Sequence, residues 1–291
     1  MYPSRLRYEA PRSLDEACAL LADGGGDAKI LAGGQSLVPM LKLRFASPEM
    51  LVDINELPGL DYLERDPDGT IHVGALCRHA TLERSTLLAE HQPTMMSAAP
   101  LVADPVVRNR GTLVGSLCHA DPQGDWASVM MALDASVVAH SSRGRRTIAM
   151  RDLVSGPFQN TLAIDEVAVE AVVPPPQGTA EGGYMKLERR VGDFATAGVA
   201  VAIDRVSGQV VRAGIGLTGV GGSTIAADEA AQALVGKSLS AEAIAEAAEL
   251  AAAAAQPHTD HRGSADYKRH LVRVFTRRLL SGLMTSGEEA A

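Results

Sequence analysis

Aromatic side chains are scarce in this sequence. Only 3% of its 291 residues are Phe, Trp or Tyr, whereas 46% are hydrophobic and 21% are charged. These proportions are those of an ordinary soluble globular protein, and the chain is long enough to bury a sizeable core without disulfides or metals. We therefore expect aliphatic cores in two or three compact units.

Cysteine is also rare. The three cysteines, Cys18, Cys77 and Cys118, are odd in number and far apart, which argues against a disulfide framework and favours a reducing, cytoplasmic compartment. Iron–sulfur clusters normally take four thiolates at close spacing, so this chain cannot hold one alone. If electrons pass through such clusters, those clusters lie on another chain.

Long basic blocks and long apolar runs are both missing. The net charge is −8, from 27 basic and 35 acidic residues, which disfavours DNA or RNA as a partner. The N-terminal segment lacks an apolar stretch of signal-peptide length, and no run approaches the roughly 20 apolar residues of a membrane span. We expect an unsecreted protein without a membrane span, in which local backbone geometry holds any bound phosphate.

Residues 1–56 are expected to form a small α/β unit. Ser13 and Glu16 have the spacing of a capping box, which predicts a helix of about ten residues ending at the glycines 24–26. Short apolar runs predict strands at 29–32 and 50–54.

Residues 57–175 and 176–291 form the second and third expected units, with a turn-rich boundary at 174–176 and 178–183. The second unit is predicted to have strands at 70–73 and 135–140, a hairpin turn at 142–144, and helices near 81–90, 94–107 and 125–134. The third is predicted to have strands at 195–204 and 209–217 and helices near 226–235, 241–255 and 266–282. We expect the chain to fray from Ser286 onward.

A glycine-containing loop, Ala32-Gly33-Gly34-Gln35-Ser36, joins an expected strand to the apolar segment 37–43. Successive backbone N–H groups with little side-chain obstruction form a concave anion site, and the following helix end adds a favourable dipole. The loop therefore fits a diphosphate. Taken alone, two adjacent glycines more often make an ordinary tight turn.

A second loop at 110–116 is again rich in small and hydroxyl residues and leads towards His119 and Asp125. Asp125 either caps the helix expected at 125–134 or accepts a hydrogen bond from a ligand hydroxyl, such as that of a ribityl or ribose group. His119 is either a structural histidine or a cofactor contact. The loop is thus a second candidate phosphate site.

Together the two loops resemble a known family. AGGQSLVPMLKLR at 32–44 and RNRGTLVGSLCHADPQGDW at 108–126 closely resemble the FAD-binding medium subunit of the molybdenum hydroxylases, the family of xanthine dehydrogenase and carbon monoxide dehydrogenase. The resemblance continues at 184–195 and 263–271 and so covers nearly the whole chain. It implies an α+β fold, with a two-part FAD-binding domain of the p-cresol methylhydroxylase and vanillyl-alcohol oxidase type followed by a smaller C-terminal α+β domain.

The resemblance also implies the cofactor contacts residue by residue. The diphosphate and adjacent flavin would be lined by Ile30, Leu31, Ala32, Gly33, Gly34, Gln35, Ser36 and Val38. The second loop would contribute Thr112, Gly115, Ser116 and His119, and Asp125 would bind a cofactor hydroxyl. Lys186 would lie near the isoalloxazine ring, with Val169 packed beside it. No catalytic side chain or metal ligand is expected, because the flavin itself carries the reaction.

The sequence departs from the commonest family pattern at two positions. Gln35 stands where carbon monoxide dehydrogenases often have histidine, and Val114 stands where a glycine is usual. The first difference weakens an assignment to carbon monoxide as substrate, although the molybdenum subunit selects the substrate in this family. The second is expected to narrow the second loop slightly.

Two other patterns are judged to be without function. Gly214–Gly219 matches the G-x-G-x-x-G dinucleotide fingerprint, but glycines 221 and 222 follow where a helix should continue, so we expect a glycine-rich strand end. His258, Asp260 and His261 follow a proline in a polar segment without a convincing fourth ligand, so a solvated loop is favoured over a metal site.

The resemblance implies an FAD-binding electron-transfer subunit in a dimer of heterotrimers. A large subunit would hydroxylate substrate at a molybdenum-pterin centre, and a small subunit would pass electrons through [2Fe-2S] clusters to this FAD and on to an external acceptor. One alternative is a free-standing FAD-dependent oxidase, for which the C-terminal unit is short. Another is an interaction subunit that has lost FAD. This alternative is disfavoured because both glycine loops are intact. The substrate stays open between carbon monoxide, an aldehyde, an N-heterocycle and an acyl thioester.

Overall fold

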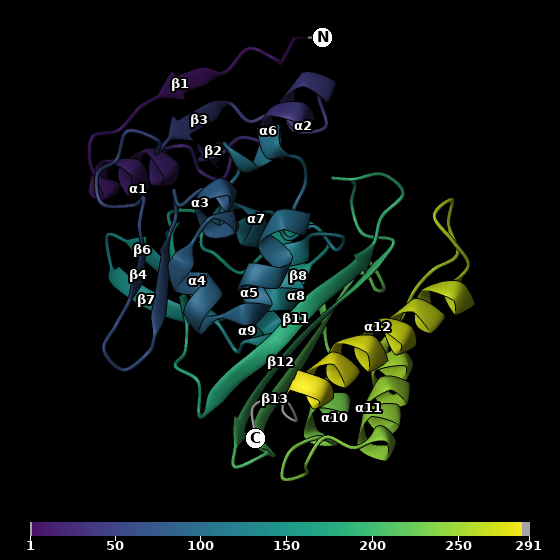
Figure 1. The fold of residues 1–291 in the computed structure, drawn as a ribbon. Helices are drawn as coiled ribbons and strands as arrows, with labels where there is room; N and C mark the ends of the chain where they lie inside the picture. The colour runs from purple at the N-terminus through teal and green to yellow at the C-terminus, as the bar shows by residue number, and fades with distance from the viewer. Residues whose placement is uncertain (1, 287–291) are drawn as a thin grey trace.

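The computed structural model describes residues 2–286. Figure 1 shows a small N-terminal sheet at the top, a middle region of short helices and a second sheet, and a long C-terminal sheet covered by three helices. Each region contains its own cluster of buried apolar side chains. The mixed helix and strand content confirms the predicted α+β class.

The N-terminal sheet is parallel, in the order β1(Arg7–Glu9), β3(Met50–Asp53), β2(Ala28–Leu31). Helix α1(Leu14–Asp23) begins as predicted, because Ser13 Oγ accepts a hydrogen bond from Glu16 N at 3.1 Å. Strand β1 has no counterpart among the predictions, since its three residues are partly exposed at the sheet edge and carry no apolar pattern. Helix α2(Leu37–Leu43) follows β2 after the loop of residues 32–36.

The middle sheet is antiparallel, in the order β4(Leu63–Arg65), β5(Ile71–Gly74), β10(Val167–Val173), β6(Ser136–Ser141), β7(Gly144–Ala149). The predicted hairpin turn between β6 and β7 is confirmed, with Gly144 at a φ of +107°. A two-stranded sheet, β8(Val154–Gly156) and β9(Gln159–Asn160), follows helix α9(Met150–Leu153).

The predicted continuous helices at 81–90 and 94–107 are wrong. The chain instead forms α3(His79–Glu83), α4(Thr86–His91), α5(Pro93–Ala98), the 3₁₀ turn η1(Ala99–Leu101) and α6(Pro105–Arg108). Pro93 and Pro105 each sit in a first helical turn, and Ser85 and Asp104 cap new helices with their side chains. Each proline and each cap starts a new helix, which outweighs the apolar periodicity.

The middle region also contains two further helices. They are α7(Leu113–His119) and α8(Asp125–Ala132), and α8 is almost wholly buried around Trp126. Trp126 and Met130 are fully buried in the core of this region.

The C-terminal sheet is antiparallel, in the order β11(Thr179–Leu187), β12(Ala197–Val206), β13(Gln209–Thr218), β14(Ile225–Ala226). Strand β11 occupies much of the segment predicted as a linker. Its Gly182 lies so close to Thr94 and to the backbone of Val201 that any Cβ would overlap them. The glycines here allow β11 to pack against α5, and they do not mark a flexible joint.

Both faces of this sheet are covered. On β12, Ala200 and Ala202 face the middle core, whereas Val199, Val201 and Ile203 face the core under α10(Asp228–Gln232), α11(Ala241–Ala254) and α12(Ala265–Ser286). Figure 1 shows these helices along the outer face of the long strands. Burial on both sides explains why this strand reads as a continuous apolar run. The expected fraying from Ser286 concerns residues outside the described range, apart from Ser286 itself.

The glycines of the G-x-G-x-x-G match serve this packing. A Cβ at Gly214 or Gly216 would overlap the backbone of Ala132 or Ser128 in α8. The segment is strand β13 pressed against a helix, which confirms the interpretation as a strand without a dinucleotide site.

Substituting Gly216 by Ala should therefore destabilise the protein. The added methyl group has no room against Ser128, and such overpacking typically costs about 1–3 kcal/mol of unfolding free energy. Gly222→Ala is the matched control, because nothing lies within 4 Å of the methyl group it adds. Urea unfolding of both variants checks this, and equal stabilities would contradict the packing role assigned to Gly216.

Candidate functional site

The two predicted glycine loops lie against each other. A Cβ at Gly33 would overlap the carbonyl oxygen of Arg110 and lie 2.7 Å from Gly111 Cα, so only glycine allows this approach. Gly34 has a φ of +72°, in the left-handed region that favours glycine. Segments far apart in the sequence thus form one surface at the junction of the N-terminal and middle regions.

A cavity of about 370 Å³ opens beside the first loop. Its size lies within the range of about 300–1,000 Å³ typical of small-molecule sites. It is lined by Leu31, Ala32, Gly33, Gly34, Gln35, Val38, Pro39, Lys42, Asp53, Asn55 and Arg110. Most of the residues predicted for the first loop therefore line one cavity. Ile30 instead lies partly buried against the N-terminal core, and Ser36 is the N-cap residue of α2.

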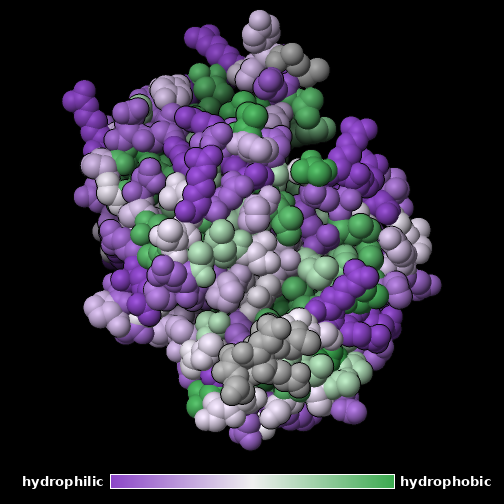
Figure 2. Space-filling model, in the orientation of Figure 1, coloured by the Kyte–Doolittle hydropathy of each residue, from purple (hydrophilic) through white to green (hydrophobic). Residues whose placement is uncertain are grey.

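The helix beyond this loop has an apolar outer surface. Leu43 is 55% exposed and Phe45 is 79% exposed, next to Arg44 in a left-handed conformation. Figure 2 shows apolar side chains gathered at the top of the molecule, around the region of α2.

Two residues that sequence reasoning missed, Asn55 and Arg78, connect the loops. Asn55 Nδ2 donates to the carbonyl oxygen of Ala32 at 2.8 Å. The Arg78 guanidinium donates to Asn55 Oδ1 at 2.7 Å and to the carbonyl oxygen of Arg110 at 2.8 Å. No local pattern points to these residues, because they are brought together only by the fold.

The second loop forms the start of α7. Thr112 Oγ1 accepts a hydrogen bond from Gly115 N at 3.1 Å, and a Cβ at Gly115 would lie 2.7 Å from that oxygen. Ser116 is half-buried in the next turn. Val114 is 2% exposed and packs into the middle core, so the expectation that it narrows the loop is wrong.

His119 ends α7. Its ring lies 5.2 Å from that of Phe158, measured between centroids. Burial lowers the pKa of His119, and the nearby Asp121 opposes this shift. The imidazole is therefore held mainly neutral.

Asp125 is the first residue of α8, and Gly124 is the N-cap, so the capping role considered for Asp125 is wrong. Its Oδ1 accepts a hydrogen bond from Tyr184 Oη at 2.6 Å, and its Oδ2 accepts one from Lys186 Nζ at 3.3 Å. Burial raises the pKa of Asp125, although Lys186 lowers it in part. Two residues predicted from separate segments, Asp125 and Lys186, are thus in direct contact.

Lys186 is almost fully enclosed. Its side chain is 1% exposed, and Nζ also contacts Glu188 at 3.1 Å and the carbonyl oxygen of Asp193 at 3.0 Å. The Lys186 ammonium group therefore lies between the carboxylates of Asp125 and Glu188. The cluster joins α8 to β11 and so fixes the C-terminal region against the middle one.

Val169 occupies an irregular position in β10, where the register with β6 shifts. It is 2% exposed and belongs to the core shared with the N-terminal region, and its carbonyl oxygen accepts from Ala75 N at 2.9 Å. A contact between Val169 and a flavin ring stays a prediction.

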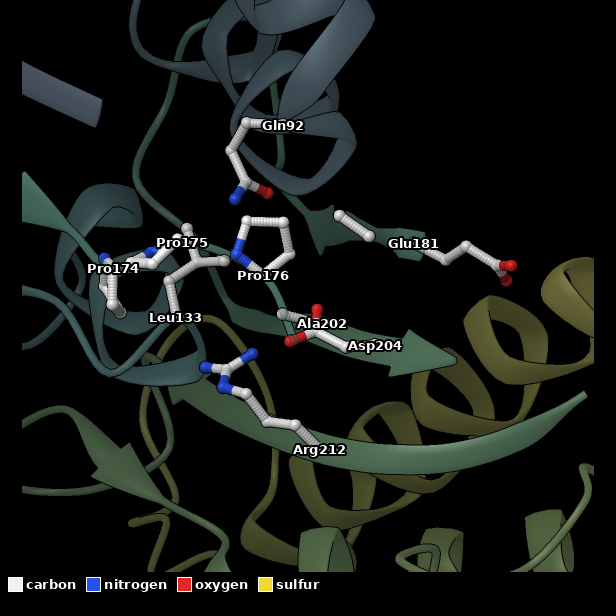
Figure 3. A pocket seen from close by; sticks show the side chains of 10 residues that line it. Gln92, Leu133, Pro174, Pro175, Pro176, Glu181, Ala202, Asp204 and Arg212 are labelled. Atoms are coloured by element: carbon white, nitrogen blue, oxygen red, sulfur yellow. The ribbon is translucent and has the colours of Figure 1, made fainter. Parts of the chain in front are cut away.

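A second hollow lies away from the glycine loops. Figure 3 shows it between the proline run at 174–176, Gln92, Asp204 and Arg212. Its volume of about 10 Å³ is roughly that needed for one water molecule. It is too small to hold a cofactor or an organic substrate.

The polar segment considered as a metal site is tied together by a lysine. Lys268 Nζ donates to Asp260 Oδ2 at 2.6 Å and to the carbonyl oxygen of His258 at 3.0 Å. Within residues 2–286, no three His, Cys, Asp or Glu side chains are grouped so that they could hold a metal ion.

The buried residue His79 contacts the second loop. Trp126 Nε1 donates to His79 Nδ1 at 3.0 Å, and His79 N donates to the carbonyl oxygen of Gly111 at 3.0 Å. A Cβ at Gly111 would lie 2.8 Å from His79 Cδ2. Burial, together with the charges of Arg108 and Arg78, lowers the pKa of His79 to about 4. The ring is thus neutral and carries its proton on Nε2.

Comparison with known families decides what this arrangement is. The family "FAD binding domain in molybdopterin dehydrogenase" matches residues 4–176, and "CO dehydrogenase flavoprotein C-terminal domain" matches residues 183–283. This chain belongs to the FAD-binding medium subunits of the molybdenum hydroxylases.

Individual relatives agree with the family over nearly their whole length. The carbon monoxide dehydrogenase medium chain of Hydrogenophaga pseudoflava is 40% identical over 97% of this chain and 98% of its own. The 6-hydroxypseudooxynicotine dehydrogenase complex subunit alpha of Paenarthrobacter nicotinovorans is 40% identical over 97% of this chain and 95% of its own. The solved carbon monoxide dehydrogenase of Hydrogenophaga pseudoflava matches with a TM-score of 0.92 and 41% identity, over 97% of this chain and 98% of that one.

The residues present fit FAD. The glycines at the loop contact leave backbone N–H groups unobstructed by side chains, and Lys42 and Arg110 bring positive charge to the cavity lining. Both features suit a diphosphate. The predicted family, oxidoreductase class and FAD cofactor are therefore confirmed.

The buried His79 predicts a pH dependence of stability. Between pH 6.5 and about 4 the unfolded chain binds a proton at this residue and the folded chain does not. The contribution of His79 to the free energy of unfolding is therefore fully present above pH 6.5. It is lost as the pH is lowered towards 4, by about 3 kcal/mol in total.

Urea unfolding of the flavin-free chain at several pH values measures this effect. His79→Gln should show a shallower loss of unfolding free energy across the same window, because glutamine does not titrate. Parallel curves for the two proteins would contradict a neutral buried His79.

Proposed function

We propose that this medium subunit transfers electrons in a heterotrimeric molybdenum hydroxylase. A small subunit carrying [2Fe-2S] clusters supplies the electrons, and an external acceptor removes them. A large subunit with a molybdenum-pterin centre oxidises the substrate, and two heterotrimers form the assembly. The match of both the FAD-binding and the C-terminal domain to this family carries the proposal.

The proposed FAD-binding parts are residues 1–56 and 57–175, and the proposed C-terminal domain is residues 176–291. When bound, FAD accepts and releases electrons singly or in pairs, which connects one-electron clusters to a two-electron acceptor. The chain itself binds and orients this cofactor. Its contribution is position and electrostatics.

The proposed contacts follow the geometry of the two loops. Residues 30–36 and Val38 meet the diphosphate and adjacent flavin from the first loop, and Thr112, Gly115, Ser116 and His119 meet the cofactor from the second. The cavity beside Gly33 and Gly34 and the contact of these glycines with the second loop support this arrangement.

The proposed contacts on the other side of the cofactor involve the buried cluster. Asp125 accepts a hydrogen bond from a cofactor hydroxyl, Lys186 lies beside the isoalloxazine ring, and Val169 packs near it. The direct contact between Asp125 and Lys186 supports a common role for the pair. A positive charge at Lys186 would stabilise negative charge on the reduced ring.

Substrate choice is assigned to the large subunit. Relatives that are equally similar to this chain carry names that refer to carbon monoxide and to 6-hydroxypseudooxynicotine. Three unpaired cysteines support a reducing compartment, and we propose the cytoplasm. In residues 2–286, none of the helices has the length and apolar character needed to cross a membrane.

Purification of the native complex tests the assignment. We expect flavin absorbance in this chain, with molybdenum and iron recovered in fixed ratio on two further polypeptides. A yellow protein that purifies alone and oxidises a small organic substrate would instead favour the free-standing oxidase, and a colourless chain would favour a subunit that has lost FAD.

Substitution of Lys186 by Gln tests its place beside the ring. We expect FAD to remain bound through the two loops, and its midpoint potential to fall because a cation near the reduced ring is lost. Lys186→Arg, which keeps the charge, is the matched variant and should retain most of the potential. Equal FAD midpoint potentials in the unmodified chain and in both variants would contradict a position of Lys186 beside the ring.

A further inference from the structure

The side chains of Asn55 and Arg78 connect the two glycine loops by hydrogen bonds. Asn55 holds the carbonyl oxygen of Ala32 in the first loop, and Arg78 holds Asn55 and the carbonyl oxygen of Arg110 beside the second. Arg78 and Thr112 are also paired through their backbones. The spacing of the loops is therefore set by side chains as well as by the glycine contact.

Asn55 is itself held in place. Its backbone N and its Nδ2 both donate to Asp53 Oδ1, at 2.9 and 2.6 Å, and Tyr8 Oη donates to Asp53 Oδ2 at 2.6 Å. The amide oxygen of Asn55 is thus oriented towards Arg78. A fixed amide that joins a backbone carbonyl on one side to a guanidinium on the other is a positioning element.

Arg110 differs from Arg78 in being exposed. Arg110 lines the cavity beside the first loop, and no carboxylate of residues 2–286 forms an ion pair with its exposed side chain. Arg78 lies close enough for its pKa to be lowered by burial and by the charge of Arg110. Arg110 lines the cavity and Arg78 is hydrogen-bonded to Asn55 of its lining, so two positive charges lie near this cavity and favour an anion there.

We propose that Asn55, Arg78 and Arg110 form one recognition unit for the diphosphate of FAD. Asn55 and Arg78 act as positioning residues that hold the two loops at the spacing the diphosphate requires. Arg110 acts as the binding residue whose guanidinium meets the phosphate oxygens. The unit rests on FAD binding by this subunit and adds to the glycine loops two positioning residues, Asn55 and Arg78, that no pattern in the sequence identifies.

Ligand binding to the flavin-free full chain tests the unit. Calorimetry with FAD, ADP and riboflavin separates the diphosphate from the ring, because ADP carries the diphosphate without the flavin and riboflavin carries the ring without phosphate. For Arg110→Ala we expect the dissociation constants of FAD and ADP to rise at least about ten-fold, as for the loss of a charged hydrogen bond, with riboflavin binding unchanged.

Arg78→Lys tests the positioning role. Lysine keeps the charge but lacks the planar fork that reaches Asn55 and the Arg110 carbonyl together, so FAD and ADP should again bind at least about ten-fold more weakly. Arg278→Ala, on the exposed side of α12, is the control and should bind both as the unmodified chain does.

Urea unfolding shows whether a variant binds more weakly because of its changed side chain or because the folded chain is less stable. Arg110→Ala should unfold at the same urea concentration as the unmodified chain, since its side chain is exposed. The unit would be overturned if Arg110→Ala and Arg78→Lys bound FAD and ADP as tightly as the unmodified chain does. It would also be overturned if these variants weakened riboflavin binding as much as FAD binding. Binding of FAD and ADP that Arg110→Ala weakens, in a chain that purifies without molybdenum-containing and iron-containing subunits, would overturn the proposed function and leave the unit intact.

Discussion

The backbone contact between Gly33 and Arg110–Gly111 is the constraint on which the site depends. No side chain fits between these segments, so the two loops meet only because glycine occupies these positions. The contact brings the end of β2 and the start of α7 to one surface. The cavity beside the first loop is thus lined by residues of that loop and by Arg110 from the segment that precedes the second loop.

The C-terminal region is fixed to this surface by equally close packing. Gly214 and Gly216 allow β13 to lie against α8, and Lys186 of β11 meets Asp125 at the start of the same helix. Helix α8 therefore carries contacts to the second loop through Trp126 and His79 on one side and to the C-terminal sheet on the other. Electrostatic effects on a bound flavin can thus originate in the C-terminal domain.

The sequence predicted the elements whose signals are long or local. The strands at 197–206 and 209–218 and the helices at 241–254 and 265–286 follow from sustained apolar patterns, and Ser13 marked the first helix through its capping box. The helices near 81–107 were predicted incorrectly because Pro93 and Pro105 start new helices inside an apolar periodicity. Each glycine loop alone is a weak signal, and the two were recognised as one site through their resemblance to a known family.

The residues that connect the loops had no such signal. Asn55 and Arg78 are 23 residues apart, and Arg78 and Arg110 are 32 apart, so their contacts exist only in the folded chain. Asn55 lies in the turn after β3, and its amide has a second role that turn chemistry does not reveal. Long-range side-chain contacts of this kind require the fold before they can be inferred.

A structure of the full chain with bound FAD tests the central claim most directly. Two loops that act together predict phosphate oxygens within about 3.2 Å of backbone nitrogens from both residues 32–36 and residues 112–116. A diphosphate held by only one of these loops, or bound outside the cavity beside Gly33 and Gly34, would contradict the account.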